Sequence, residues 1–194
     1  MPVGAEAPQR LPRLLDDRPL TQRALAFASV RHRGQRRSSD SAPFILHPLE
    51  VAQLLRSHGH RDEVVAAAIL HDVVEDTGVE PAEIAERFGP EVAGLVDVLT
   101  EPGGIASYGE RKARLRDAVS RANDDALAIF AADKVAKVRE LRMIIATGSV
   151  ADAGKLEHYW ASLELLEARL PRDPLVQQLR FELEALELLP PRTA

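Results

Sequence analysis

The stretch VVAAAILHDVVEDT, residues 64–77, decides the fold of this chain. Its first half is apolar and rich in alanine, which is typical of a helix buried on most of its circumference. Its second half places His71, Asp72, Glu75 and Asp76 within little more than one further helical turn, where unpaired buried charges would be costly. Residues three and four apart lie on one helix face, so these four side chains can border one cavity. The stretch therefore predicts a core helix that ends at a bound cation or a hydrogen-bonded cleft.

Length and composition narrow the class of protein. The 194 residues suffice for one domain with a sizeable core, and nothing in the sequence specifies an oligomeric state. The absence of cysteine excludes disulfides, thiolate zinc sites and a cysteine nucleophile, and favours a cytoplasmic location. No segment approaches about 18 consecutive apolar residues, so we expect no membrane segment. The net charge of −5 argues against general binding of nucleic acids or anionic membranes.

Helical signals run along the whole chain, and no segment alternates as a strand does. The predicted helices span residues 23–32, 48–55, 64–74, 81–88, 90–99, 110–121, 125–145, 151–170 and 174–189. The last two are leucine-rich, amphipathic and separated by the sequence PRDP, which predicts a helical hairpin. We therefore predict an all-α helical bundle closed by a C-terminal helical hairpin. Residues 20–189 would form a single domain, with tails at residues 1–19 and 190–194.

Local details refine this prediction. Thr21 and Asp62 each precede a helical run and are predicted to cap the helix that follows. The segment EPGGIASYG, residues 101–109, is rich in glycine and interrupts the helical pattern. Loops of this kind are often mobile and functional, so we expect a lid at this position.

Four polar residues stand within or at the ends of predicted core helices. His47 begins one helix, His71 and Asp72 end another, and Asp133 interrupts the apolar run 126–138. Two imidazoles and two carboxylates without a thiolate suit Mn²⁺, with Fe²⁺ or Mg²⁺ as alternatives, better than tetrahedral zinc. The sequence therefore predicts one metal centre built from these four residues.

Glu75 and Asp76 supply carboxylates beside this predicted centre. A divalent cation activates water for attack on phosphorus, and a neighbouring carboxylate can accept the proton or orient the water. The alternative is a helix end that trails into a solvated acidic turn. Because Asp72, Glu75 and Asp76 would otherwise repel one another, the catalytic interpretation is preferred.

Basic residues gather in the segment RHRGQRR, residues 31–37. Arginine forms bidentate contacts with phosphate and stacks on bases, but such a run can equally be a solvated charged surface. His32, between two arginines, is as consistent with a structural hydrogen bond as with a ligand. His158, beside Tyr159, is expected to pack between helices or to line a cleft.

Taken together, these motifs resemble a known family. The segments FASVRHRGQRR, PFILHPLEVAQLL, AAAILHDVVEDTGVEPAEIAERFGPEVAGLVDVLT and FAADKVAKVREL follow one another between residues 27 and 141. In this order they resemble the HD-type hydrolase domain of RelA/SpoT proteins. The length and the C-terminal hairpin make the chain most similar to the single-domain small alarmone hydrolases.

This resemblance implies an all-helical fold and a Mn²⁺-dependent reaction on a small nucleotide. The reaction would remove the 3′-pyrophosphate of ppGpp or pppGpp and give GDP or GTP and pyrophosphate. The resemblance implies His47, His71, Asp72 and Asp133 as metal ligands and Glu75 and Asp76 as the catalytic pair. It implies Arg37 as the residue that stacks on the base, and Lys134, next to the ligating aspartate, as a further substrate-binding residue. Lys155 and Tyr159, one helical turn apart, would line the substrate cleft.

Lys137 departs from the family pattern, which has an asparagine at this position, and Ala136 replaces a ring. A cation in place of an amide predicts weaker selection of the base, with Lys137 free to bind a phosphate. The same chemistry on another nucleotide, an adenine alarmone or the 2′-phosphate of NADPH, therefore stays an alternative. A non-catalytic nucleotide-binding regulator is a second alternative, which Glu75 and Asp76 disfavour.

Overall fold

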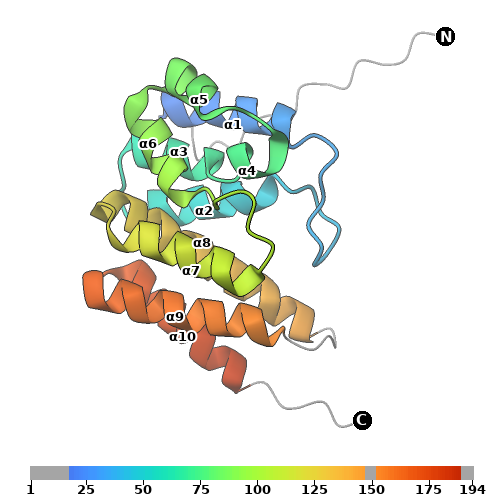
Figure 1. Cartoon of the computed structure of the whole chain (residues 1–194), viewed down its shortest axis with the longest axis vertical. Coiled ribbons are helices and arrows are strands. Elements are labelled where there is room, and N and C mark those ends of the chain that lie inside the picture. The colour runs from blue at the N-terminus through green and yellow to red at the C-terminus, as the bar shows by residue number, and fades with distance from the viewer. Residues whose placement is uncertain (1–17, 147–151, 189–194) are drawn as a thin grey trace, which may run out of the picture.

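The structure is a computed structural model that describes residues 18–146 and 152–188 (Figure 1). Within these ranges it contains ten α-helices and no strand beyond an isolated bridge between Arg36 and Pro43. The predicted all-α class is therefore confirmed. Of the predicted tails, residues 1–17 and 190–194 lie outside the described residues.

The helices follow one another with short connections. In chain order they are α1 (Pro19–Arg31), α2 (Leu46–Ser57), α3 (Asp62–Leu70), α4 (Val73–Thr77), α5 (Pro81–Phe88), α6 (Pro90–Leu99), α7 (Tyr108–Ser120), α8 (Asp124–Ala146), α9 (Ala153–Arg169) and α10 (Pro174–Glu187). Figure 1 shows α1 to α6 at one end of the molecule, α7 and α8 across its middle, and α9 with α10 at the other end. The predicted C-terminal hairpin is present and packs on α7 and α8.

Helix α3 is the centre of the first half of the fold. Every residue from Val64 to Leu70 is fully buried, and α3 packs against α1, α2, α6 and α8. Its three alanines leave room for these neighbours to approach closely. The first half of α8 is equally enclosed, from Ala126 to Ala136. The polar residues that interrupt these two apolar segments are therefore carried into the interior.

The predicted helix 64–74 is wrong in one respect, because the structure divides it. Helix α3 ends at Leu70, His71 and Asp72 form a turn, and the short helix α4 begins at Val73. Helix α4 ends at Gly78, whose φ of 70° is a left-handed conformation that glycine adopts at little cost. The predicted ligands His71 and Asp72 therefore lie at a break between two helices, and Glu75 and Asp76 lie on the second of these helices.

The predicted caps Thr21 and Asp62 are also wrong. Helix α1 already begins at Pro19, and Asp62 is the first residue of α3. The Asp62 carboxylate instead accepts hydrogen bonds from the backbone amides of Leu20 and Thr21, both at 3.0 Å, and from the Thr21 hydroxyl. Asp62 thus caps α1 across 41 positions of sequence and ties the two helices together.

Two further sequence predictions concern the loop at residues 101–109 and membrane-spanning segments. The segment between α6 and α7 is irregular, as expected for a loop, and α7 begins at Tyr108. In the described part of the chain, no helix has the length and apolar character needed to cross a membrane.

Candidate metal centre and active site

The structure brings the four predicted metal ligands together. The Nε2 atom of His47 lies 3.1 Å from Oδ1 of Asp133 and 3.6 Å from Oδ2 of Asp72. The Nε2 atom of His71 lies 3.2 Å from Oδ2 of Asp72 and 3.6 Å from Oδ1 of Asp133. The start of α2, the turn between α3 and α4, and the middle of α8 supply these atoms. Two imidazole nitrogens and two carboxylate oxygens thus face one small volume.

Unpaired atoms at this centre are consistent with a bound cation. The Nδ1 atom of His71 lies 2.7 Å from the carbonyl oxygen of Ala68, a bond that orients the ring and points Nε2 at the other ligands. Nε2 of His71 and Oδ2 of Asp72 are buried without a hydrogen-bond partner among the described residues. Such atoms are costly unless something satisfies them, and a divalent cation would serve both. The donor set therefore fits a divalent metal ion.

The charges at the centre support the same conclusion. Burial alone would lower the pKa of His71, but the negative charges of Asp72 and Asp133 raise it to about 10. Burial would raise the pKa of Asp133, yet the ammonium groups of Lys134 and Lys137, together with the hydrogen bond to His47, hold it well below its usual range. The carboxylates are thus kept ionised, and their negative charge favours a cation at this centre.

Lys134, predicted to bind substrate, lines the same cavity as Glu75 and Asp76, and its ammonium group also contacts Asp133. Its buried Nζ atom lies 2.5 Å from Oδ2 of Asp133 and 4.4 Å from the centre of the Phe130 ring. The ammonium group thus binds one oxygen of the predicted ligand Asp133, while the other oxygen, Oδ1, faces the two histidines.

Glu75 and Asp76 border an inner cavity of about 260 Å³ beside the four ligands. The backbone amide of Glu101 donates to Oε2 of Glu75 over 3.3 Å, and the side-chain amide of Gln35 donates to the carbonyl oxygen of Asp76 over 2.9 Å. Burial, followed by the charge of Asp72, raises the pKa of Glu75. Burial, Asp72 and Glu75 together raise the pKa of Asp76 to about 6. Both carboxylates are therefore stronger proton acceptors than exposed carboxylates.

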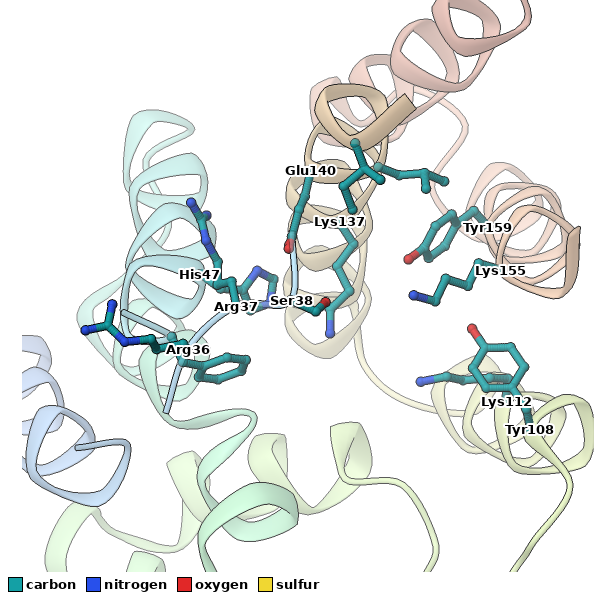
Figure 2. Close-up of a pocket in the computed structure, with 13 residues that line it drawn as sticks. Arg36, Arg37, Ser38, His47, Tyr108, Lys112, Lys137, Glu140, Lys155 and Tyr159 are labelled. Atoms are coloured by element: carbon teal, nitrogen blue, oxygen red, sulfur yellow. The ribbon is translucent and has the colours of Figure 1, made fainter. Parts of the chain in front are cut away.

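An outer cavity of about 340 Å³ adjoins the inner one (Figure 2). The loop after α1 and the start of α2 form one side, α7 and α9 form the other, and Lys137 of α8 lies between them. Its basic side chains are Arg36, Arg37, Lys112, Lys137 and Lys155. Phe44, Lys112 and Lys137 line both cavities, and we call this place the junction. The two cavities thus form one cleft with a metal-binding end and a basic end.

Arg37, Lys137, Lys155 and Tyr159, predicted to bind substrate, all line the outer cavity. The guanidinium group of Arg37 is ion-paired with Asp40 of the same loop. Nζ of Lys137 lies 3.8 Å from Oδ1 of Asp133, so this side chain reaches from the outer cavity to the metal centre. Burial raises the pKa of Tyr159, which keeps its hydroxyl protonated as a donor.

Sequence reasoning missed Tyr108 and Lys112, which line the cleft from α7. Both stand in a charged helix, and no local pattern separates them from exposed residues of the same types. They reach the cleft because α7 packs on α8 and α9. Phe44, next to the histidine of the PFILHP segment, was quoted in the family motif without a role.

His32 and His158 have structural roles. The Nδ1 atom of His32 lies 2.6 Å from Oε1 of Gln35, and its ring packs on Phe44 with centroids 4.8 Å apart. His158 is buried between α7 and α9 and accepts a hydrogen bond from Arg116 over 2.7 Å. Neither histidine is among the residues that converge on the metal centre.

Comparison with known proteins identifies the family. Residues 24–156 match the family described as HD domain. This chain belongs to the HD-domain family. It is 32% identical over 149 residues to guanosine-3′,5′-bis(diphosphate) 3′-pyrophosphohydrolase MESH1 of Xenopus tropicalis, covering 75% of this chain and 83% of that protein. The resemblance to alarmone hydrolases is thus confirmed for the HD-domain chain.

Bacterial relatives of this HD-domain chain are much longer. A probable GTP pyrophosphokinase of Mycobacterium leprae is 39% identical over 130 residues, which are 64% of this chain and 16% of that protein. A guanosine-3′,5′-bis(diphosphate) 3′-pyrophosphohydrolase of Aquifex aeolicus is 39% identical over 104 residues, which are 54% of this chain and 15% of that protein. The chain therefore spans only a small part of these two relatives.

Solved structures share the HD-domain fold. A structure described as a metazoan ortholog of SpoT that hydrolyzes ppGpp matches with a TM-score of 0.76 at 26% identity, covering 93% of this chain and 100% of the other. A protein of Listeria monocytogenes EGD-e matches with a TM-score of 0.67 at 32% identity, covering 74% and 97%. The fold is therefore shared across most of the chain.

Proposed function

We propose that this HD-domain protein hydrolyses the 3′-pyrophosphate of ppGpp or pppGpp, giving GDP or GTP and pyrophosphate. The observation that carries the proposal is the junction, where a cavity with a metal-ligand set and two carboxylates opens into a basic cavity. Such a cleft suits a nucleotide whose reacting phosphates and remaining phosphates lie at different ends. The names of the animal and bacterial relatives support the same substrate.

We infer that His47, His71, Asp72 and Asp133 hold Mn²⁺, with Fe²⁺ or Mg²⁺ as alternatives. Imidazole and carboxylate together suit these ions, and the chain has no thiolate to offer. When bound, the cation supplies a Lewis acid that offsets phosphate charge and lowers the pKa of water. The cytoplasm stays the expected location, from the absence of cysteine.

The acidic pair would perform the proton transfer. Glu75 and Asp76 border the cavity that would receive the 3′-pyrophosphate, and either carboxylate can accept a proton from the attacking water. Glu101 and Gln35 limit the positions that these two residues can take. Water adds to the phosphorus next to the ribose, the bond from this phosphorus to the 3′ oxygen breaks, and that oxygen leaves with a proton.

The basic side chains would bind and orient the rest of the nucleotide. Lys112 and Lys137 lie at the junction, where they would offset charge on the phosphates. Arg37, on one side of the outer cavity, would stack on the base. Lys155 and Tyr159, on the other side, would provide a second cation and a hydroxyl donor.

One experiment separates the candidate functions. The protein is incubated with Mn²⁺ and, in separate reactions, ppGpp, pppGpp, the adenine counterpart of ppGpp, and NADPH, and products are resolved by chromatography. We expect GDP or GTP with pyrophosphate, at the highest kcat/KM of the set. Faster release of orthophosphate from NADPH, or faster hydrolysis of the adenine nucleotide, would favour the first alternative. Binding without any turnover would favour the non-catalytic regulator.

A further inference from the structure

Glu101 is a buried carboxylate next to the active site that the proposed reaction does not use directly. It follows α6, and its side chain is only 6% exposed. The carboxylate accepts hydrogen bonds from Arg111, at 2.5 Å, and from Lys112. Its backbone amide donates to the carboxylate of Glu75. One residue therefore contacts a member of the catalytic pair with its backbone and a lysine of the junction with its side chain.

The contact with Lys112 has an electrostatic consequence. Lys112 lies at the junction, and its side chain is 17% exposed. Burial lowers its pKa to about 8, and the neighbouring ammonium groups of Lys134 and Lys137 act in the same direction. A carboxylate in contact opposes both effects and fixes the direction of a long, flexible side chain. Glu101 is placed to supply both the charge and the orientation.

We propose that Glu101 is a positioning residue for phosphate binding, which holds the ammonium group of Lys112 at the junction. The inference rests on the proposed function, because it assigns Lys112 to the phosphates of the substrate. The rival explanation is that Glu101 only anchors the loop, since Arg111 also donates to the carbonyl oxygen of Ile105. Loss of a loop anchor would disturb Glu75 as well, whereas loss of the contact with Lys112 would affect mainly binding.

Steady-state kinetics of a double-mutant cycle test the inference. Lys112→Met should raise KM for ppGpp about tenfold, because a charge-assisted contact is lost. Glu101→Gln keeps the backbone amide and the shape, so KM should rise about fivefold with kcat changed by less than about threefold. In the double variant, KM should not exceed that of Lys112→Met by more than about twofold. Effects on KM that multiply, or a fall in kcat as large as the rise in KM, would overturn the inference.

Arg111→Gln is the matched control, because it removes the other ion pair of Glu101 and leaves Lys112 in place. It should leave KM within about twofold of wild type, and a rise equal to that in Glu101→Gln would favour the loop-anchor explanation. Melting curves report whether each variant folds. If Glu101→Gln does not fold, Glu101→Asp replaces it in the cycle. This variant keeps the charge but shortens the side chain by one methylene, and we again expect it to raise KM only when Lys112 is present.

The two proposals fail in different ways. If the wild-type protein hydrolyses none of the nucleotides, the proposed function is wrong. In that case, calorimetry gives the Kd for ppGpp of each Mn²⁺-loaded variant, and these Kd values replace KM in the double-mutant cycle. A Kd that Lys112→Met leaves unchanged, or no binding at all, would overturn the role of Glu101 as well.

Discussion

The Nε2 atom of His47 lies 3.1 Å from Oδ1 of Asp133, although 86 positions separate the two residues. Helices α2 and α8 pack directly against each other, which brings the start of one helix to the middle of the other. His71 and Asp72 complete the group from the end of the fully buried helix α3. Because residues 64–70 and the first half of α8 are enclosed, packing of the protein core places the predicted ligands His71, Asp72 and Asp133.

The first prediction concerns the metal centre. His71→Ala removes one of the converging nitrogens and should lower metal affinity by more than about 100-fold, since even outer partners of ligands contribute up to that amount. Metal content after dialysis, measured by mass spectrometry, reports the loss. His58→Ala, at an exposed histidine, is the control and should retain metal. Full metal occupancy and activity in Asp133→Ala would show that the proposed ligand set is wrong.

The second prediction separates the acidic pair from the ligands. Glu75→Gln and Asp76→Asn preserve shape but remove a basic oxygen, so kcat should fall by roughly 100-fold or more. Metal content should stay at the wild-type level, because neither residue is among the four converging ligands. Near-normal turnover in both variants would support the alternative interpretation, in which Glu75 and Asp76 only form a solvated acidic turn. Loss of metal would instead make them ligands.

The third prediction follows from the raised pKa of Asp76, which burial and neighbouring carboxylates bring to about 6. A proton acceptor must be ionised, so kcat/KM should fall as pH decreases below this pKa. A bound cation favours the carboxylate, so we expect this limb to lie between about pH 5 and pH 6. The profile is measured between about pH 5 and pH 9 at saturating Mn²⁺, with metal content followed at each pH. A flat profile down to about pH 5 would contradict a role for Asp76 as the base.

The fourth prediction concerns Arg37 and its ion pair with Asp40. Arg37→Ala should raise KM for every nucleotide with a smaller effect on kcat, because stacking depends little on base identity. Asp40→Asn should lower KM, by no more than about fivefold, because it releases the guanidinium group from an exposed ion pair. Arg33→Ala, at an exposed arginine of the same segment, is the control. A higher KM in Asp40→Asn would mean that Asp40 orients Arg37 for binding.

The fifth prediction concerns Lys137, whose ammonium group lies at the junction and 3.8 Å from Asp133. Phosphate is common to all the nucleotides, so a lysine here selects little between bases. Lys137→Asn should raise KM for all of them and sharpen the preference for ppGpp over its adenine counterpart. The ratio of kcat/KM values decides the matter. A wild-type guanine preference above about 100-fold, unchanged in the variant, would place base selection elsewhere in the cleft.

The sequence by itself determined the class of fold and the residues at the centre of the site. The helices 81–88 and 90–99 begin at the predicted prolines, and the first ends before Gly89 as predicted, because these residues act within a single turn. The hairpin of α9 and α10 was visible in its leucine periodicity. His47, His71, Asp72 and Asp133 were visible because polar residues interrupted apolar helices, where a buried charge needs a partner.

Only the tertiary structure decided which groups meet. The capping of α1 by Asp62 and the meeting of His47 with Asp133 both depend on contacts between different helices. Lys112 and Glu101 carry no local signal, since a lysine in a charged helix and a glutamate at the start of a glycine-rich segment are both usually solvated. They become part of the cleft because α7 packs across α8 and α9 and buries them beside it. Helical periodicity records which face of each helix is buried, but the partner on that face is set by packing between distant segments.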